Sequence, residues 1–157
     1  DQLDSPVNQV NAVHLAQRQG LKLVEARVAE SGAFRTQVDL VADTGATQTR
    51  VSGTLFDERH PRLICIDDFE IEAILDGHLL VTRHTDKPGV VAGFSRSIAD
   101  HGINIIRMHL GPVAQTGGAM AVIGLDQPLS GEALQEVRAD EAIESALQLT
   151  MHSALRL

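Results

Sequence analysis

A short stretch in the middle of the chain carries the residues best suited to bind a small charged molecule. His84 and Asp86 lead into the pair Pro88-Gly89, where an apolar-striped segment begins that is predicted to be a helix. A helix N-terminus offers free backbone N–H groups to an anion, and a carboxylate such as that of Asp86 accepts charge-assisted hydrogen bonds from an ammonium group. This combination predicts a site for a zwitterionic amino acid rather than a catalytic centre.

Asn104 extends this candidate site, because it opens the strand predicted after the helix. We expect His84, Asp86 and Asn104 to gather at one end of a small sheet, and valine at Gly89 to crowd the loop and damage both fold and binding. Each residue also has a purely structural explanation as a helix start, an N-cap or a solvated strand end. The candidate effector-binding residues are His84, Asp86, Lys87, Pro88, Gly89, Val90, Asn104 and Ile105.

The elements that would position these residues follow the order βαββαβ. Pro88 is expected in the first turn of the helix, where its missing N–H costs nothing, and Ser130 is expected to cap the second helix. This order predicts an antiparallel four-stranded sheet with both helices on one side. The expected elements are strand 78–84, helix 88–101, strands 104–110 and 118–125, a helix after residue 130, and strand 143–151.

The first half of the chain predicts a separate, mostly antiparallel α+β domain. A short helix is expected from Val10 to a stop at Gly20, then a strand from Leu21, and two hairpins that turn near residues 43–46 and 67–68. We place the domain boundary at Asp76-Gly77, which gives an intervening domain over residues 1–76, expected to be incomplete, and a second domain over 77–157. The predicted fold class is therefore α+β throughout, the second domain being ferredoxin-like.

Composition narrows the possible functions. The 157 residues carry a formal charge of −8 and four Phe, with no Tyr or Trp. Such a chain is poorly suited to nucleic acid or to an anionic membrane, so neither is expected as a partner. The single Cys65 fits a reducing cytoplasm. Neither a glycine-rich dinucleotide turn, a nucleophile beside a base, nor a metal-ligand pattern is evident, so no catalytic role, cofactor or metal is expected in this chain.

Two groups of residues give the chain a family resemblance. Residues 84–91 with 102–105 resemble the ACT domain that ends bacterial D-3-phosphoglycerate dehydrogenases, and residues 7–12, 18–20 and 51–56 resemble their intervening, allosteric substrate-binding domain. The resemblance implies a regulatory segment that binds L-serine between two ACT domains for feedback inhibition. It also implies that His84 faces the serine hydroxyl or carboxylate, Asp86 holds the ammonium, and Asn104 comes from the neighbouring subunit.

The same resemblance implies further partners and leaves alternatives open. It implies a homodimer or homotetramer in the cytoplasm, Arg62 as part of a phosphate or anion site, and NAD as the cofactor of a parent dehydrogenase but not of this chain. One alternative is the regulatory part of an iron–sulfur L-serine dehydratase. Another is a dimerisation module without a ligand. The residues do not decide which amino acid is preferred.

Overall fold

The chain divides into two units. The computed structural model describes residues 8, 10–26, 36–57, 60–111 and 118–151, and contacts separate residues 1–33 from 34–157. In the first unit, helix α1 (Ala12–Arg18) is followed by Gly20 at φ +78°. The strand predicted from Leu21 is wrong, because residues 21–26 lie in no helix or strand. Alternating side chains do not make a strand unless a neighbouring strand pairs its backbone N–H and C=O groups.

The second unit begins with the two predicted hairpins, which together form one antiparallel sheet of order β1-β2-β3-β4. At the first turn the Asp43 carboxylate accepts a hydrogen bond from the Gly45 N–H at 2.7 Å. At the second turn Asp67 adopts φ +51°. The strands are β1 (Gln37–Asp43), β2 (Gln48–Phe56), β3 (His60–Ile66) and β4 (Phe69–Ile74).

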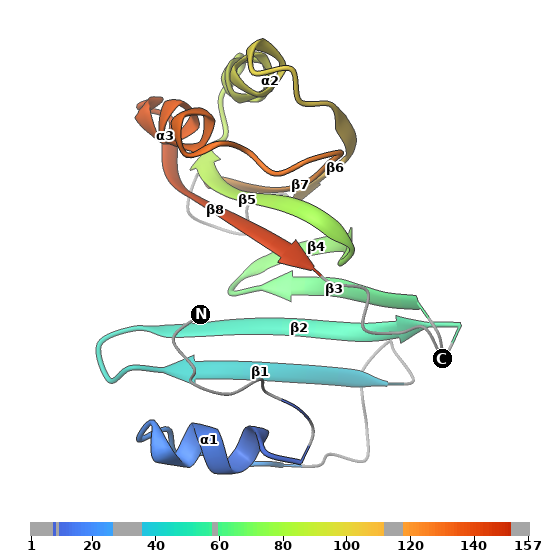
Figure 1. Ribbon diagram of the computed structural model, residues 1–157, viewed down its shortest axis with the longest axis vertical. Coiled ribbons are helices and arrows are strands. Elements are labelled where there is room, and N and C mark those ends of the chain that lie inside the picture. The colour runs from blue at the N-terminus through green and yellow to red at the C-terminus, as the bar shows by residue number, and fades with distance from the viewer. Residues whose placement is uncertain (1–7, 9, 27–35, 58–59, 112–117, 152–157) are drawn as a thin grey trace. The chain divides into compact units, whose positions relative to one another are not determined.

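The rest of the second unit has the predicted order βαββαβ (Figure 1). Its sheet has the strand order β6-β7-β5-β8, and all neighbouring strands are antiparallel, which confirms the expected α+β fold. The elements are β5 (Gly77–Thr85), α2 (Val90–Asp100), β6 (Ile105–Gly111), β7 (Gly118–Leu125), α3 (Gly131–Ala139) and β8 (Ile143–Met151).

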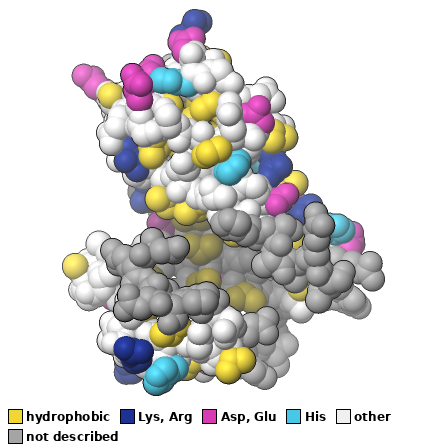
Figure 2. Space-filling view, in the orientation of Figure 1, with side chains coloured by type: hydrophobic (Ala, Val, Ile, Leu, Met, Phe, Trp, Pro, Cys, Tyr) yellow, Lys and Arg dark blue, Asp and Glu magenta, His cyan; other side chains and the backbone are white. Residues whose placement is uncertain are grey.

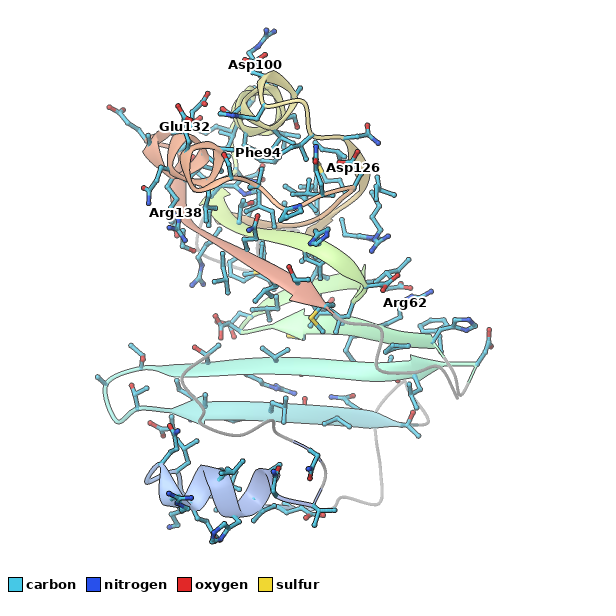
Figure 3. The ribbon with its side chains drawn as sticks, viewed as in Figure 1. Arg62, Phe94, Asp100, Asp126, Glu132 and Arg138 are labelled. Atoms are coloured by element: carbon cyan, nitrogen blue, oxygen red, sulfur yellow. The ribbon has the colours of Figure 1, made fainter. Side chains whose placement is uncertain are left out.

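One face of this second sheet is covered by both helices. Phe94 of α2, labelled in Figure 3, and Val137 of α3 are buried in the same apolar core as Leu80 of β5. As predicted, Ser130 caps α3, and its side-chain oxygen accepts the Ala133 N–H at 3.1 Å. Because core side chains of both helices meet the same strands, the start of α2 is held at a fixed position over the sheet.

The opposite face of this sheet packs on the first sheet. Leu79 and Val122 share a buried cluster with Phe69 and Ile71 of β4. Arg83 of β5 adds a polar contact, since its guanidinium lies 4.8 Å from the centre of the Phe69 ring. The residue next to His84 therefore contacts the first sheet.

Acidic side chains dominate the surface around the two helices of the second unit. Figure 2 shows them over the end of the unit that carries α2 and α3, where Asp100, Glu132 and Glu136 are exposed. Together with the formal charge of −8, this surface repels other anions and repels a second copy of the chain when salt is low.

Candidate functional site

The connection between β5 and α2 forms an exposed loop with an uncapped helix start. Asp86, Lys87 and Pro88 are exposed, and Gly89 is the N-cap at φ +96°, with no side chain bonded to the helix N–H groups. In the described parts of the chain, no acceptor meets the backbone N–H of residue 91 or 92. The helix begins at Val90, so Pro88 precedes the cap instead of lying in the first turn as predicted. The loop therefore offers an anion two free donors beside the Asp86 carboxylate.

His84 lies beneath this loop and not on its surface. It is 2% exposed, its Nδ1 lies 3.2 Å from the Thr82 hydroxyl, and its ring meets the Phe94 ring edge-on with 5.7 Å between centroids. Burial lowers the pKa of His84, while Asp86 on the loop and Glu144 on β8 partly oppose that shift. The imidazole is therefore neutral near pH 7 and supports the loop from the core.

This burial predicts a loss of stability in mild acid. The folded His84 pKa lies below its usual 6.5, so the unfolded chain binds the proton more readily as the pH falls below that value. The free energy of unfolding is then expected to decrease between about pH 7.5 and 5.5, when measured by urea denaturation. His84→Gln should flatten this slope. If the free energy of unfolding depends on pH equally in wild type and His84→Gln, the loss is not due to His84. Asp39 does not account for a loss in this range, because its pKa is about 2 and it titrates only in stronger acid.

Two other predicted site residues belong to the core. Val90 is 8% exposed within the cluster beneath the helices, and Ile105 packs partly buried against that cluster. Val90 and Ile105 are the first residues of α2 and β6, so their side chains anchor the starts of these elements in the core and do not line an open site.

Asn104 and His84 lie at opposite ends of the sheet, which corrects the expectation that one chain gathers them. On β7, Leu125 faces both Ile105 and His78, whereas Ala119 faces His84. His78 and His84 are six residues apart on one strand, which corresponds to about 20 Å. Helix α2 carries the chain back from the end of β5 to the end of the sheet where β5 began. Strand β6 therefore starts far from the end of β5.

The start of β6 is nevertheless a well-ordered position for an amide side chain. The Asn104 N–H donates to the Asp126 carboxylate at 2.9 Å, and the Asp126 N–H donates to the Asn104 carbonyl at 3.1 Å. The Asn104 residue is exposed. Its side chain therefore points from a fixed backbone towards solvent, where a second molecule could reach it.

Thr85 is a polar residue near the loop that the sequence did not single out. Its hydroxyl oxygen is buried and, among the described residues, has no hydrogen-bond partner. Burying a hydroxyl without a hydrogen-bond partner costs free energy. Its position next to His84 was the only sequence signal.

Gly89 is required for its backbone conformation. A Cβ built there meets nothing within 4 Å, so the crowding expected from the sequence is wrong within a single chain. Its φ of +96° strains any L-residue, and Gly89→Ala is expected to cost about 1–2 kcal/mol in urea denaturation. Gly131→Ala is the matched control, because that site is equally open and has no left-handed φ. Equal costs at both glycines would contradict this reasoning.

Arg62 contacts neighbouring groups on the first sheet. Its guanidinium donates to the Pro61 carbonyl at 3.1 Å and lies 6.0 Å from the centre of the Phe56 ring. Figure 3 labels Arg62 at one end of β3. A phosphate role for Arg62 stays a prediction.

The described residues do not fit a metal or a dinucleotide. Within them, no three His, Cys, Asp or Glu side chains gather to hold a metal ion. The β5–α2 turn has one glycine and an acidic side chain in an antiparallel sheet, whereas a pyrophosphate needs a glycine-rich turn in a parallel one. No helix in these parts of the chain has the length and apolar character needed to cross a membrane.

Comparison with known proteins finds a similar domain for each half of the chain. Residues 1–67 match the model of the D-3-phosphoglycerate dehydrogenase intervening domain, and residues 78–142 match the ACT domain. D-3-phosphoglycerate dehydrogenases of Methanocaldococcus jannaschii, Synechocystis and Bacillus subtilis are 24%, 26% and 26% identical over 84%, 89% and 86% of this chain. The aligned part is 25%, 25% and 26% of those proteins, so the chain spans about a quarter of their length.

Proposed function

We propose that this chain, which combines the intervening domain of the D-3-phosphoglycerate dehydrogenases with an ACT domain, binds a small L-amino acid, with L-serine as the first candidate. The proposal places the domain boundary at Asp76-Gly77. Binding would regulate a dehydrogenase whose catalytic residues and NAD lie outside these 157 residues. A cytoplasmic location belongs to the same proposal.

The uncapped start of α2 is the observation that carries this proposal. Two N–H groups without acceptors suit a carboxylate, and the exposed Asp86 beside them suits an ammonium group. The two charged groups of an amino acid are separated by one carbon atom, so they can meet both features at once. The neutral His84 would support the loop from below. Because it carries no charge, it would not compete with the ligand's ammonium group for the Asp86 carboxylate.

A second copy of the chain would complete the site with Asn104. Strand β6 is at one edge of its sheet, and Ile106 and Leu110 on it are 56% and 52% exposed. If two β6 edges paired antiparallel, the start of one would meet the end of the other. Within one copy, the C-terminal end of β6 lies near loop 85–89, because Gly111 and His84 face neighbouring residues of β7. The start of β6 in the other copy would therefore reach this loop. Asn104 of one copy would then approach Asp86 of the other.

The first test is calorimetric titration of the chain with L-serine, with D-serine, glycine and L-alanine as controls. Saturable binding of L-serine, at one ligand per chain or one per two chains, supports the proposal. A ligand that binds only the folded dimer should add about 2.7 kcal/mol of stability at a hundredfold excess over its Kd. Absence of heat and of stabilisation with all four compounds would reject it.

A mixing experiment tests whether Asn104 acts from the second copy. Asp86→Ala and Asn104→Ala are each expected to lose binding as pure proteins. When mixed and allowed to exchange subunits, half of the dimers contain both variants, and each of those has one intact site. About a quarter of the wild-type binding capacity should then return. A mixture that stays inactive while exchange is confirmed by mass would place Asn104 outside the site.

Regulation would follow from a preference of the ligand for one arrangement of the pair. A ligand can shift an equilibrium only by the difference between its affinities for the two states. Arg83 would transmit such a shift, because it precedes His84 on β5 and its guanidinium lies 4.8 Å from the centre of the Phe69 ring of the first sheet.

A further inference from the structure

Arg83 lies between two carboxylates that belong to different sheets. Its Nη1 is 3.9 Å from the Asp67 Oδ2 in the turn between β3 and β4, and its Nε is 3.8 Å from the Glu144 Oε2 on β8. Hydrogen bonds between such charged groups are usually about 2.7–2.9 Å long, so Arg83 is not yet hydrogen-bonded to either carboxylate. A small movement of one carboxylate would therefore shift the guanidinium towards the other.

Glu144 connects Arg83 to the end of the sheet that carries the proposed amino-acid site. On β8, Ser145 faces Arg83 and Ile143 faces His84, so Glu144 is an extra residue in a β-bulge. A bulge redirects the side chain of its extra residue. Burial lowers the pKa of His84, and the charge of Glu144 partly opposes that shift. One of the two carboxylates therefore acts on the strand end from which loop 85–89 begins.

The other carboxylate, that of Asp67, is built into a turn of the first sheet. Asp67 has φ +51°, and its Oδ1 accepts a hydrogen bond from the Arg50 N–H at 3.0 Å. The Asp67 carbonyl oxygen lies 3.1 Å from the Sγ atom of Cys65, which is partly buried and is the only cysteine of the chain. A change in this turn is therefore expected to alter the rate at which the Cys65 thiol reacts.

We propose that Arg83 is a positioning residue that couples the amino-acid site to the turn between β3 and β4. This inference rests on the proposed binding of a small amino acid at loop 85–89. The ammonium group of the ligand attracts the Glu144 carboxylate, and Arg83 then moves towards Asp67 and holds the turn more firmly. Cys65 is therefore protected in the ligand-bound protein, and a firmly held turn strengthens ligand binding by the same factor.

Alkylation of Cys65 tests this coupling in the full chain. At a saturating L-serine concentration, set from calorimetric titration, iodoacetamide should react with wild-type Cys65 at least about fivefold more slowly than without L-serine. Arg83→Met removes the charge but keeps a side chain that can contact the Phe69 ring. This variant should bind L-serine, and its Cys65 should react equally fast with and without the ligand.

Arg96→Met is the matched control for Arg83→Met. It removes the same charge from an exposed position on α2, away from both carboxylates. Its Cys65 should be protected by L-serine as in wild type.

Asp67→Asn tests the other end of the link. Asparagine tolerates a left-handed φ and can still accept the Arg50 N–H, so the turn should keep its structure. Cys65 in this variant should also lose its response to L-serine. Combining Asp67→Asn with Arg83→Met should cause no further change, because both substitutions remove the same interaction.

The outcomes separate this inference from the proposed function. If L-serine binds but leaves the Cys65 rate unchanged in wild type, or protects Cys65 fully in Arg83→Met or Asp67→Asn, the coupling through Arg83 is overturned and the amino-acid site stands. Absence of L-serine binding in the titration would reject the site, and with it the role of Arg83.

Discussion

Asp86→Ala is expected to weaken amino-acid binding by one to two orders of magnitude while leaving the fold intact. The carboxylate is the acidic group of the exposed loop before α2, and the proposed ligand brings an ammonium group to it. Hydrogen bonds between charged groups contribute about 1.5–3 kcal/mol, so their loss weakens binding by about 10- to 150-fold. Calorimetric titration with L-serine measures this loss, and urea denaturation checks that the free energy of unfolding is unchanged.

The matched control for Asp86→Ala removes the same charge at the other end of the same helix. Asp100 is exposed at the C-terminal end of α2, where a negative charge does not favour the helix dipole. Asp100→Ala should bind L-serine as wild type does. Normal binding by Asp86→Ala would show that the ammonium group is held elsewhere. Equal losses of binding in Asp86→Ala and Asp100→Ala would show that only the change in net charge weakens binding.

Phe94→Ala is expected to produce the largest loss of stability. Phe94 on α2 is 1% exposed, is the largest fully buried side chain among the described residues, and packs against the strands beside His84. Removing a buried phenyl ring costs about 3–5 kcal/mol through lost transfer energy and the cavity that remains. Because small domains have only about 5–15 kcal/mol in total, urea denaturation should show a strongly lowered midpoint.

Two further variants separate burial from simple loss of an aromatic ring. Phe56 is 40% exposed on β2, so Phe56→Ala should cost much less than Phe94→Ala. Phe94→Leu keeps much of the volume and should cost less than alanine at the same position. A small effect of Phe94→Ala would mean that the core beneath the helices repacks around the cavity and does not hold the α2 loop in place.

The order of the elements could be predicted because its signals are local. Ser130 before an apolar stripe fixed the start of α3, and its cap is present as predicted. Gly102 ends α2 with φ +70°, which favours glycine over other residues. Pro88 shows the limit of such signals, because a proline marks the start of a helix to within a residue or two but does not fix the first hydrogen-bonded residue.

The sequence by itself therefore determined which strands and helices form from residue 37 onwards, and it indicated the loop at residues 84–89 as the place for chemistry. Only the tertiary structure decided which of its residues face solvent and which ends of the sheet they share. His84 became a core residue because alternation on β5 directs it towards Phe94, and Asn104 moved to the far end because the crossover makes β5 and β6 parallel. Burial and distance across a sheet depend on residues far apart in the chain, so no local pattern specifies them.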